Sequence, residues 1–489
     1  MNPNHDAAAP PEAPGRTQIL PALVLSMLAF SMVQTAVVPI LPALAAAMRV
    51  SGGTVAWLMT ANLLAAAVLT PLLGRFGDLY GRKPMLLVSL GGLVLGSVLA
   101  VTTESFAWLV VARVLQGAGG GVLPLAISVM RGQLPPQRVP GGIAAVSAAM
   151  GIGSALGLVL TGLLMEQWSH KSVFWAGLLL SLVAIAWSWA GIPRDRTTDH
   201  AARVDALGAL TLAGWLCALL LAVSKGNAWG WGSGRIVGLF AAAVVIAAVW
   251  VVVELRVRDP LVSIRMLVSP VVAITNLAGA VIGFGMYGCF MVISNFAQTP
   301  EEVAHYGFSA DVLLAGVMLL PSAIGSMTAA PVGAKLIAAR GPRIPLSLGG
   351  LLAGLAMGFL AVLNGHPVCL YLASGVFGFG VGLAYTAMPA AINSAVPVEQ
   401  SGIANGMNAV FRTVGGAVGT AVLGATLASD TIEGLPLPTL DAYQEAFWIT
   451  AIGCFVAAVA PLAIRIPVSP ANPGNPAAQQ SGPTEKTVA

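Results

Sequence analysis

The residues that could do chemistry in this chain are few, and most of them lie in two short stretches. Residues 74–83 read GRFGDLYGRK and form the densest charge cluster near the start of the chain. Glycines permit a tight turn there, and the carboxylate of Asp78 can pair with the basic residues beside it. The second stretch is apolar except for Arg113 and, three residues later, Gln116. Reversible ion pairing and hydrogen bonding are the chemistry that both stretches support.

Bond-making chemistry is not indicated. The five histidines fall in predicted tails or loops without metal-ligand spacing, and none of the 19 Asp and Glu residues lies in the middle of a predicted span. A membrane-embedded enzyme needs convergent nucleophiles, acids or metal ligands at bilayer depth, and a phosphate-binding loop would follow a strand. We therefore predict no enzyme activity, no metal, no cofactor and no use of ATP.

The elements that must position these residues are membrane helices. Hydrophobic residues make up 57% of the chain and charged residues 9%, against about 25% charged in a typical soluble domain. A bilayer core needs about 20 apolar residues per helix. The sequence predicts an all-α polytopic membrane protein with fourteen transmembrane helices, near residues 18–41, 54–74, 84–102, 106–130, 141–165, 172–192, 205–224, 234–254, 269–296, 310–332, 343–363, 368–391, 403–428 and 444–466.

The basic residues predict the orientation. With both termini cytoplasmic, 17 Lys and Arg residues lie inside and four outside, and the remaining two, Arg113 and Arg412, lie within spans. Such an excess of positive charge is typical of cytoplasmic loops. We expect a multi-pass protein of the cell inner (plasma) membrane, and we attribute its basic character to topology, so no nucleic-acid partner is expected.

Three motifs resemble those of the major facilitator superfamily. Residues 74–83 resemble the loop between its helices two and three, and LVVARVLQGAGG at 109–120 is similar to its helix-four motif. Residues 151–162, GIGSALGLVLTG, resemble the glycine-rich helix five of its antiporters, although Leu158 stands where a proline is usual. With two extra central helices, the chain resembles the fourteen-helix drug/proton antiporter branch, which contains multidrug and antibiotic exporters.

The resemblance implies the domain organisation. The major facilitator fold has two six-helix bundles, here with two additional helices between them. The expected parts are a disordered cytoplasmic N-terminus (1–17), an N-terminal bundle (18–192), two additional transmembrane helices with their loops (193–268), a C-terminal bundle (269–466) and a disordered cytoplasmic tail (467–489).

The resemblance also implies roles for motif residues. The family uses the first motif as a conformational latch that breaks and reforms, and Leu79 here replaces its usual basic residue after the aspartate. The expected latch residues are Gly74, Asp78, Gly81, Arg82 and Lys83. The expected packing residues of helix five are Gly153, Gly157 and Gly162, since small residues let helices approach closely. Arg113 is expected to face the central cavity and to act in proton coupling or substrate contact; the alternative is a structural tie to a carbonyl.

Helix one departs from the branch, because Gln34 replaces its acid and Val38 its asparagine. Without a mid-membrane carboxylate, a permanent cation would find no counter-charge. We therefore expect neutral or anionic amphipathic substrates. The candidate substrate-binding or coupling residues are Gln34, Asn62, Arg113, Gln116, Asn276, Tyr287, Asn295, Tyr385 and Asn408. For each polar residue the alternative is a hydrogen bond between helices, worth about 0.6 kcal/mol on average.

The sequence thus favours a secondary active exporter of amphipathic small molecules, such as drugs, antibiotics or natural products, that works by alternating access. The expected partners are the substrate, protons and the bilayer, and the expected state is a monomer. Protons would be carried by Asp78 or Asp311, or with an anionic substrate. The alternative is uptake or facilitated transport of a small metabolite by the same fold, without proton antiport.

Overall fold

The computed structural model describes residues 18–50, 52–55, 57–194, 205–257, 260–432, 435 and 437–463. The expected disordered termini, 1–17 and 467–489, lie outside this range, as do residues 195–204 of the predicted central part. Within the described residues the chain is helical and holds no strand, apart from an isolated bridge between Thr431 and Pro438.

Fourteen helices of the described chain are long and apolar enough to cross a membrane, which confirms the predicted number. They are α1 (Ile19–Ala47), α3 (Trp57–Tyr80), α4 (Arg82–Thr102), α5 (Phe106–Gly117) continued by η1 (Ala118–Gly121) and α6 (Val122–Gln133), α7 (Val139–Gln167), α8 (His170–Gly191), α9 (Ala206–Trp229), α10 (Gly234–Arg256), α12 (Pro270–Gln298), α14 (Val312–Arg340), α15 (Arg343–Val362), α16 (Pro367–Ala395), α17 (Ser401–Ser429) and α18 (Leu440–Val459). The short elements are α2 (Gly52–Val55), α11 (Ile264–Leu267), α13 (Glu301–Ala304), η2 (Val398–Gln400) and η3 (Ala460–Ala463).

The predicted loop after the second span is mostly helix. α3 continues to Tyr80, and α4 begins at Arg82, so Gly81 alone joins them. Its φ of 106° lies in a region that side chains other than glycine rarely adopt. Asp78 therefore sits on the last turn of α3, where its side chain has a fixed direction, and not on a loop.

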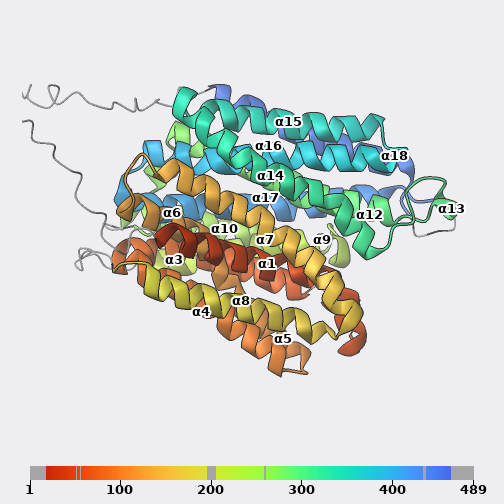
Figure 1. Cartoon of the computed structure of the whole chain (residues 1–489), viewed down its shortest axis with the longest axis horizontal. Helices are drawn as coiled ribbons and strands as arrows, with labels where there is room; N and C mark the ends of the chain where they lie inside the picture. Colours follow the sequence, from red (N-terminus) through yellow and green to blue (C-terminus); the bar gives the residue numbers. More distant parts are fainter. Residues whose placement is uncertain are drawn as a thin grey trace, which may run out of the picture.

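The two halves of the chain form separate groups of helices that lie side by side (Figure 1). Buried apolar residues of α1, α4, α6, α7 and α8 form the core of the first group, and those of α12, α14, α15, α16 and α18 the core of the second. The additional helix α9 contacts both groups, because Leu220 and Val223 pack against Ala67 of α3 and against Ala417 and Ala421 of α17. The predicted domain boundaries remain predictions.

The helix-five glycines bring α7 against two different neighbours. A Cβ atom on Gly153 would lie 2.6 Å from the Leu28 carbonyl oxygen, and one on Gly157 would lie 2.7 Å from that of Met32, so both face α1. A Cβ atom on Gly162 would instead lie 3.0 Å from the side chain of Leu313 in α14. Small residues therefore allow α7 to pack on α1 and to meet α14 of the other half of the chain.

Candidate functional site

Asp78 joins the two halves of the chain. Its carboxylate oxygens accept hydrogen bonds from the backbone N–H groups of Gly402 (3.3 Å) and Ile403 (3.1 Å). Both donors lie in the first turn of α17, where N–H groups have no partner within the helix and the helix dipole favours a negative charge. We call the end of the molecule where α3 ends and α17 begins the latch end.

Two glycines allow this contact. A Cβ atom on Gly74 would lie 2.6 Å from the carbonyl oxygen of Gly402, and a Cβ atom on Gly402 would lie 2.6 Å from that of Gly74. Neither backbone could accept a side chain without moving. The glycines of this pair thus set how closely α3 and α17 approach at the latch end.

Two arginines add hydrogen bonds between the halves at the same end. Arg82 donates from Nη2 to the carbonyl oxygen of Val398 (3.3 Å). Arg131, at the end of α6, donates from Nη1 to Oδ1 of Asn393 (3.2 Å) and from Nη2 to the Asn393 carbonyl (3.1 Å). Sequence reasoning missed Arg131, whose partners lie 262 residues away. Lys83, expected in the latch, donates to carbonyls of Trp189 and Ile192 in its own half.

Arg113 is enclosed within the first half. Its side chain is 0% exposed and donates from Nε to the Leu58 carbonyl (3.3 Å) and from Nη1 to Oε1 of Gln116 (2.8 Å). Gln116 in turn donates to Ser97 (3.1 Å), while Asn62 donates to the Arg113 carbonyl (2.9 Å). These three predicted residues form one network that ties α3, α4 and α5 together. In this conformation Arg113 is enclosed by these partners, and its expected role in proton coupling or substrate contact stays a prediction.

A second polar cluster lies in the other half, around Arg412 of α17. Its Nη1 donates to Oδ1 of Asn408 (3.0 Å), and its guanidinium carbon lies 4.9 Å from the ring centre of Tyr385. Asn408 donates to Oδ1 of Asn276 (3.1 Å). The ring of Tyr287 lies against Gly416, one turn further along α17. The structure therefore brings four predicted residues together around an arginine that the sequence prediction had left out of the site.

Gln34 and Asn295 lie apart from both clusters. Gln34 is partly exposed on α1, and Asn295 is exposed near the end of α12. Neither takes part in the hydrogen bonds described around Arg113 or Arg412. Their expected contact with substrate stays a prediction.

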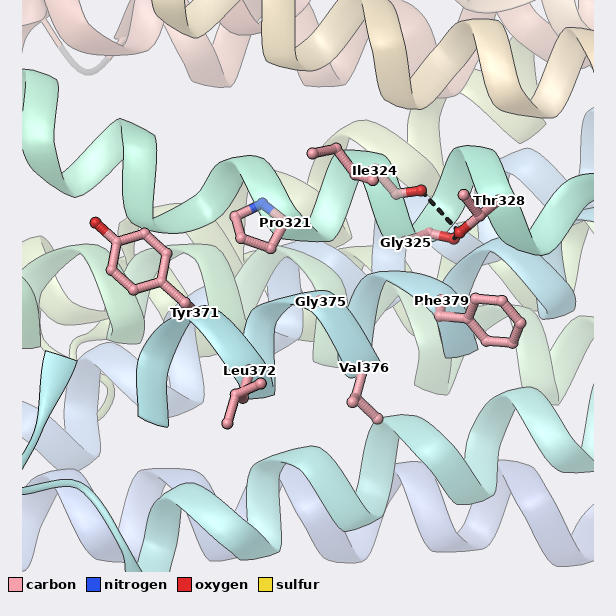
Figure 2. Close-up of a pocket in the computed structure, with 9 residues that line it drawn as sticks. All are labelled: Pro321, Ile324, Gly325, Thr328, Tyr371, Leu372, Gly375, Val376 and Phe379. Atoms are coloured by element: carbon pink, nitrogen blue, oxygen red, sulfur yellow. Dashed lines mark hydrogen bonds between the residues drawn. The ribbon is translucent and has the colours of Figure 1, made fainter. Parts of the chain in front are cut away.

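A shallow groove of about 450 Å³ between α14 and α16 holds none of the predicted residues. Figure 2 shows Ile324 and Thr328 of α14 on one wall, and Leu372, Val376 and Phe379 of α16 on the other. The wall is almost entirely apolar, as expected for helix faces that meet lipid. Within the described part of the chain, no group of three or more His, Cys, Asp or Glu side chains could hold a metal ion.

Comparison with known proteins gives the class to which this arrangement belongs. The family model described as Major Facilitator Superfamily matches residues 23–420 and, in a second alignment, residues 280–488. The chain belongs to this superfamily, as its motifs predicted. The family indicates a transporter in the membrane rather than an enzyme.

Two similar proteins narrow the comparison. An uncharacterized MFS-type transporter of Mycobacterium tuberculosis is 30% identical over 418 residues, which are 84% of this chain and 59% of that protein. The tetracenomycin C resistance and export protein of Streptomyces glaucescens is 29% identical over 408 residues, which are 83% of this chain and 74% of that protein. The chain thus spans less than two thirds of the first relative's length.

A solved structure supports the fold. The human organic anion transporter MFSD10 (TETRAN) has a TM-score of 0.63 at 17% sequence identity, covering 93% of this chain and 100% of that one. At this identity the likeness concerns the fold alone. The chain therefore has the all-helical major facilitator fold and is a multi-pass membrane protein.

Proposed function

We propose that this chain is a secondary active exporter of amphipathic small molecules that works by alternating access in the cell inner (plasma) membrane. The observation that carries the proposal is the latch between Asp78 and the first turn of α17, where hydrogen bonds join the two halves at one end. The name of the similar Streptomyces protein supports export of drug-like molecules. The excess of basic residues in the loops supports a cytoplasmic latch end and cytoplasmic termini.

The geometry suggests how the two conformations exchange. Three contacts close the latch end: Asp78 with α17, Arg82 with η2, and Arg131 with α16. Loss of these few hydrogen bonds would let the halves separate there, while the cores of each half stay intact. A rocking motion of this kind exposes a central site first to one side and then to the other.

Protons are the proposed coupling ion, and Asp78 is the proposed carrier. A proton on Asp78 would remove the charge that the N–H groups of α17 stabilise and would weaken the latch. Asp311, the other candidate, accepts a hydrogen bond from Leu314 N–H (2.7 Å) as the N-cap of α14, within one half of the chain. Protonation of Asp311 would therefore act on one helix end and not on the contact between the halves.

Accumulation of amphipathic antibiotics and dyes in an efflux-deficient bacterial host tests the direction of transport. Cells that express the wild-type chain should accumulate less of at least one compound than cells that express Asp78→Asn at the same membrane level. Higher accumulation in the wild-type cells would support the alternative, uptake of a metabolite. Equal accumulation of every compound would contradict transport of this class.

A further inference from the structure

Arg412 stands near the middle of a membrane-spanning helix. It is eleven residues from the start of α17, so it lies about 16 Å along the helix. Its guanidinium has five N–H donors, and the hydrogen bond described for it goes to the neutral side chain of Asn408. Among the described residues, no Asp or Glu forms an ion pair with it. A cation at this depth normally has a partner or faces open space.

Arg412 differs from Arg113 in its burial and in the number of its hydrogen-bond partners. Arg113 is 0% exposed, and its three nitrogens contact the Leu58 carbonyl, the Gln116 amide oxygen and the Met59 sulfur. Arg412 is only partly buried, and none of its nitrogens is a buried atom without a partner. The N–H groups of Arg412 that Asn408 does not accept are therefore available to a ligand, whereas those of Arg113 are not.

A second free donor lies beside Arg412. Asn276 is 2% exposed, and its Oδ1 accepts from Asn408, while its Nδ2 is buried without a hydrogen-bond partner. Asn408 connects the two, since its own oxygen accepts from Arg412. The cluster of Asn276, Asn408 and Arg412 thus has unused donors, and its amide oxygens are already occupied. Such a site is satisfied by a ligand that brings acceptors.

Two aromatic rings border the same cluster. The face of Tyr385 lies 4.9 Å from the guanidinium carbon of Arg412. The ring of Tyr287 lies so close to Gly416 that a Cβ atom there would be 2.3 Å from it. Flat apolar surface beside a cation fits an aromatic organic anion better than a small inorganic anion, which would gain nothing from the rings.

We propose that Arg412, with Asn276 and Asn408 as further polar groups and Tyr287 and Tyr385 as aromatic walls, binds the carboxylate or phenolate of an aromatic amphipathic substrate. This inference rests on the proposed export function, because it names the substrate class of the transporter. The lack of carboxylates in the middle of the predicted spans only argues against cationic substrates, whereas a binding role for Arg412 would favour anionic ones. Arg113 keeps a structural role in the other half.

Binding to the purified full chain tests the site without the need for transport. Dansylglycine is an anion at neutral pH, and its methyl ester is neutral, so the pair differs mainly in charge. Wild-type protein should bind the acid at least tenfold more tightly than the ester. Arg412→Gln should remove this preference, and Arg412→Lys should keep part of it, because the charge stays while the planar fork is lost.

Arg235→Gln serves as the matched control, since Arg235 is exposed on the first turn of α10, and it should bind both probes like the wild type. If Arg412→Gln fails to fold, Arg412→Lys and Asn276→Ala test the site instead. Asn276→Ala should lower the preference for the acid over the ester about threefold. The proposed site would be contradicted if the wild-type protein showed no preference for the acid, whether it bound both probes or neither. It would also be contradicted by a folded Arg412→Gln that keeps the preference.

Efflux from cells separates this inference from the export proposal. Arg412-dependent binding with no efflux of any compound would leave the anion site standing and reject export. Export of a neutral probe by a wild type that shows no preference for the acid would reject the site and leave export standing.

Discussion

Asp78 is the residue on which the contact between the halves depends most directly. Hydrogen bonds to a charged group contribute about 1.5–3 kcal/mol, against about 0.5–1.5 kcal/mol for neutral pairs. Asp78→Asn keeps the shape of the side chain but removes the charge and one of the two acceptors used by Gly402 and Ile403. We expect efflux to fall about tenfold at an unchanged protein level in the membrane.

Asp311→Asn is the matched control for this variant. It makes the same chemical change at an exposed helix N-cap that does not connect the halves. Its efflux should stay within about twofold of wild type, because a cap contributes only to the local stability of one helix. Equal losses in the two variants would mean that the latch has no special role.

Arg113 should matter for stability. Arg113→Ala leaves the Gln116 amide oxygen without its donor and removes the second donor of the Leu58 carbonyl, and an unsatisfied buried group costs about 1–3 kcal/mol. The detergent-purified variant should therefore melt several degrees below wild type. Arg235→Ala, at an exposed position, should melt like wild type. A variant of Arg113 that melts normally but transports nothing would instead indicate a role in coupling.

Among elements, the crossing of α3 and α17 at the latch end is the most sensitive to added volume. Gly402→Ala would place a methyl group 2.6 Å from the Gly74 carbonyl oxygen, which forces the halves apart or the helices to bend. We expect at least a tenfold loss of efflux at a normal membrane level. The same substitution at Gly91 of α4 meets nothing within 4 Å and should leave efflux unchanged. If Gly402→Ala transports like Gly91→Ala, close approach at the latch end is not needed.

The membrane-spanning helices could be predicted from the sequence, because local forces determine them. Hydropathy alone identified the fourteen spans, because each must satisfy its own backbone in lipid. The charged stretch at 74–83 identified Asp78, but the sequence suggested a loop, since charges are rare in spans. The structure extends α3 through it, because the carboxylate finds N–H donors on α17.

Packing between distant helices is what the sequence could not predict. Arg113 and Arg412 look alike as single arginines in apolar segments. How far each is enclosed depends on how closely its neighbours approach; at Gly415 of α17, for example, a Cβ atom would lie 1.8 Å from the Ala280 carbonyl oxygen of α12. The sequence pattern alone therefore could not distinguish the enclosed Arg113 from the partly buried Arg412, and the sequence prediction left Arg412 out of the site.

The whole molecule is two helical groups that meet through α3 and α17 at the latch end and through α7 and α14, with α9 in contact with both. The helix ends at the latch end are held by side chains that can exchange partners, such as Arg82 and Arg131, while each group keeps its own apolar core. A structure of this kind can change the side to which it opens without unfolding either core. We expect its substrate selection to follow from the charge of the cluster around Arg412.

The most direct test of proton-coupled export is efflux from preloaded, efflux-deficient bacterial cells that express the wild-type chain, with and without a protonophore. Three probes are compared: ethidium as a permanent cation, dansylglycine as an anion and dansylglycine methyl ester as a neutral compound. We expect protonophore-sensitive efflux of the acid or the ester, and little efflux of ethidium. Protonophore-sensitive efflux of ethidium, with none of the other two, would contradict this expectation.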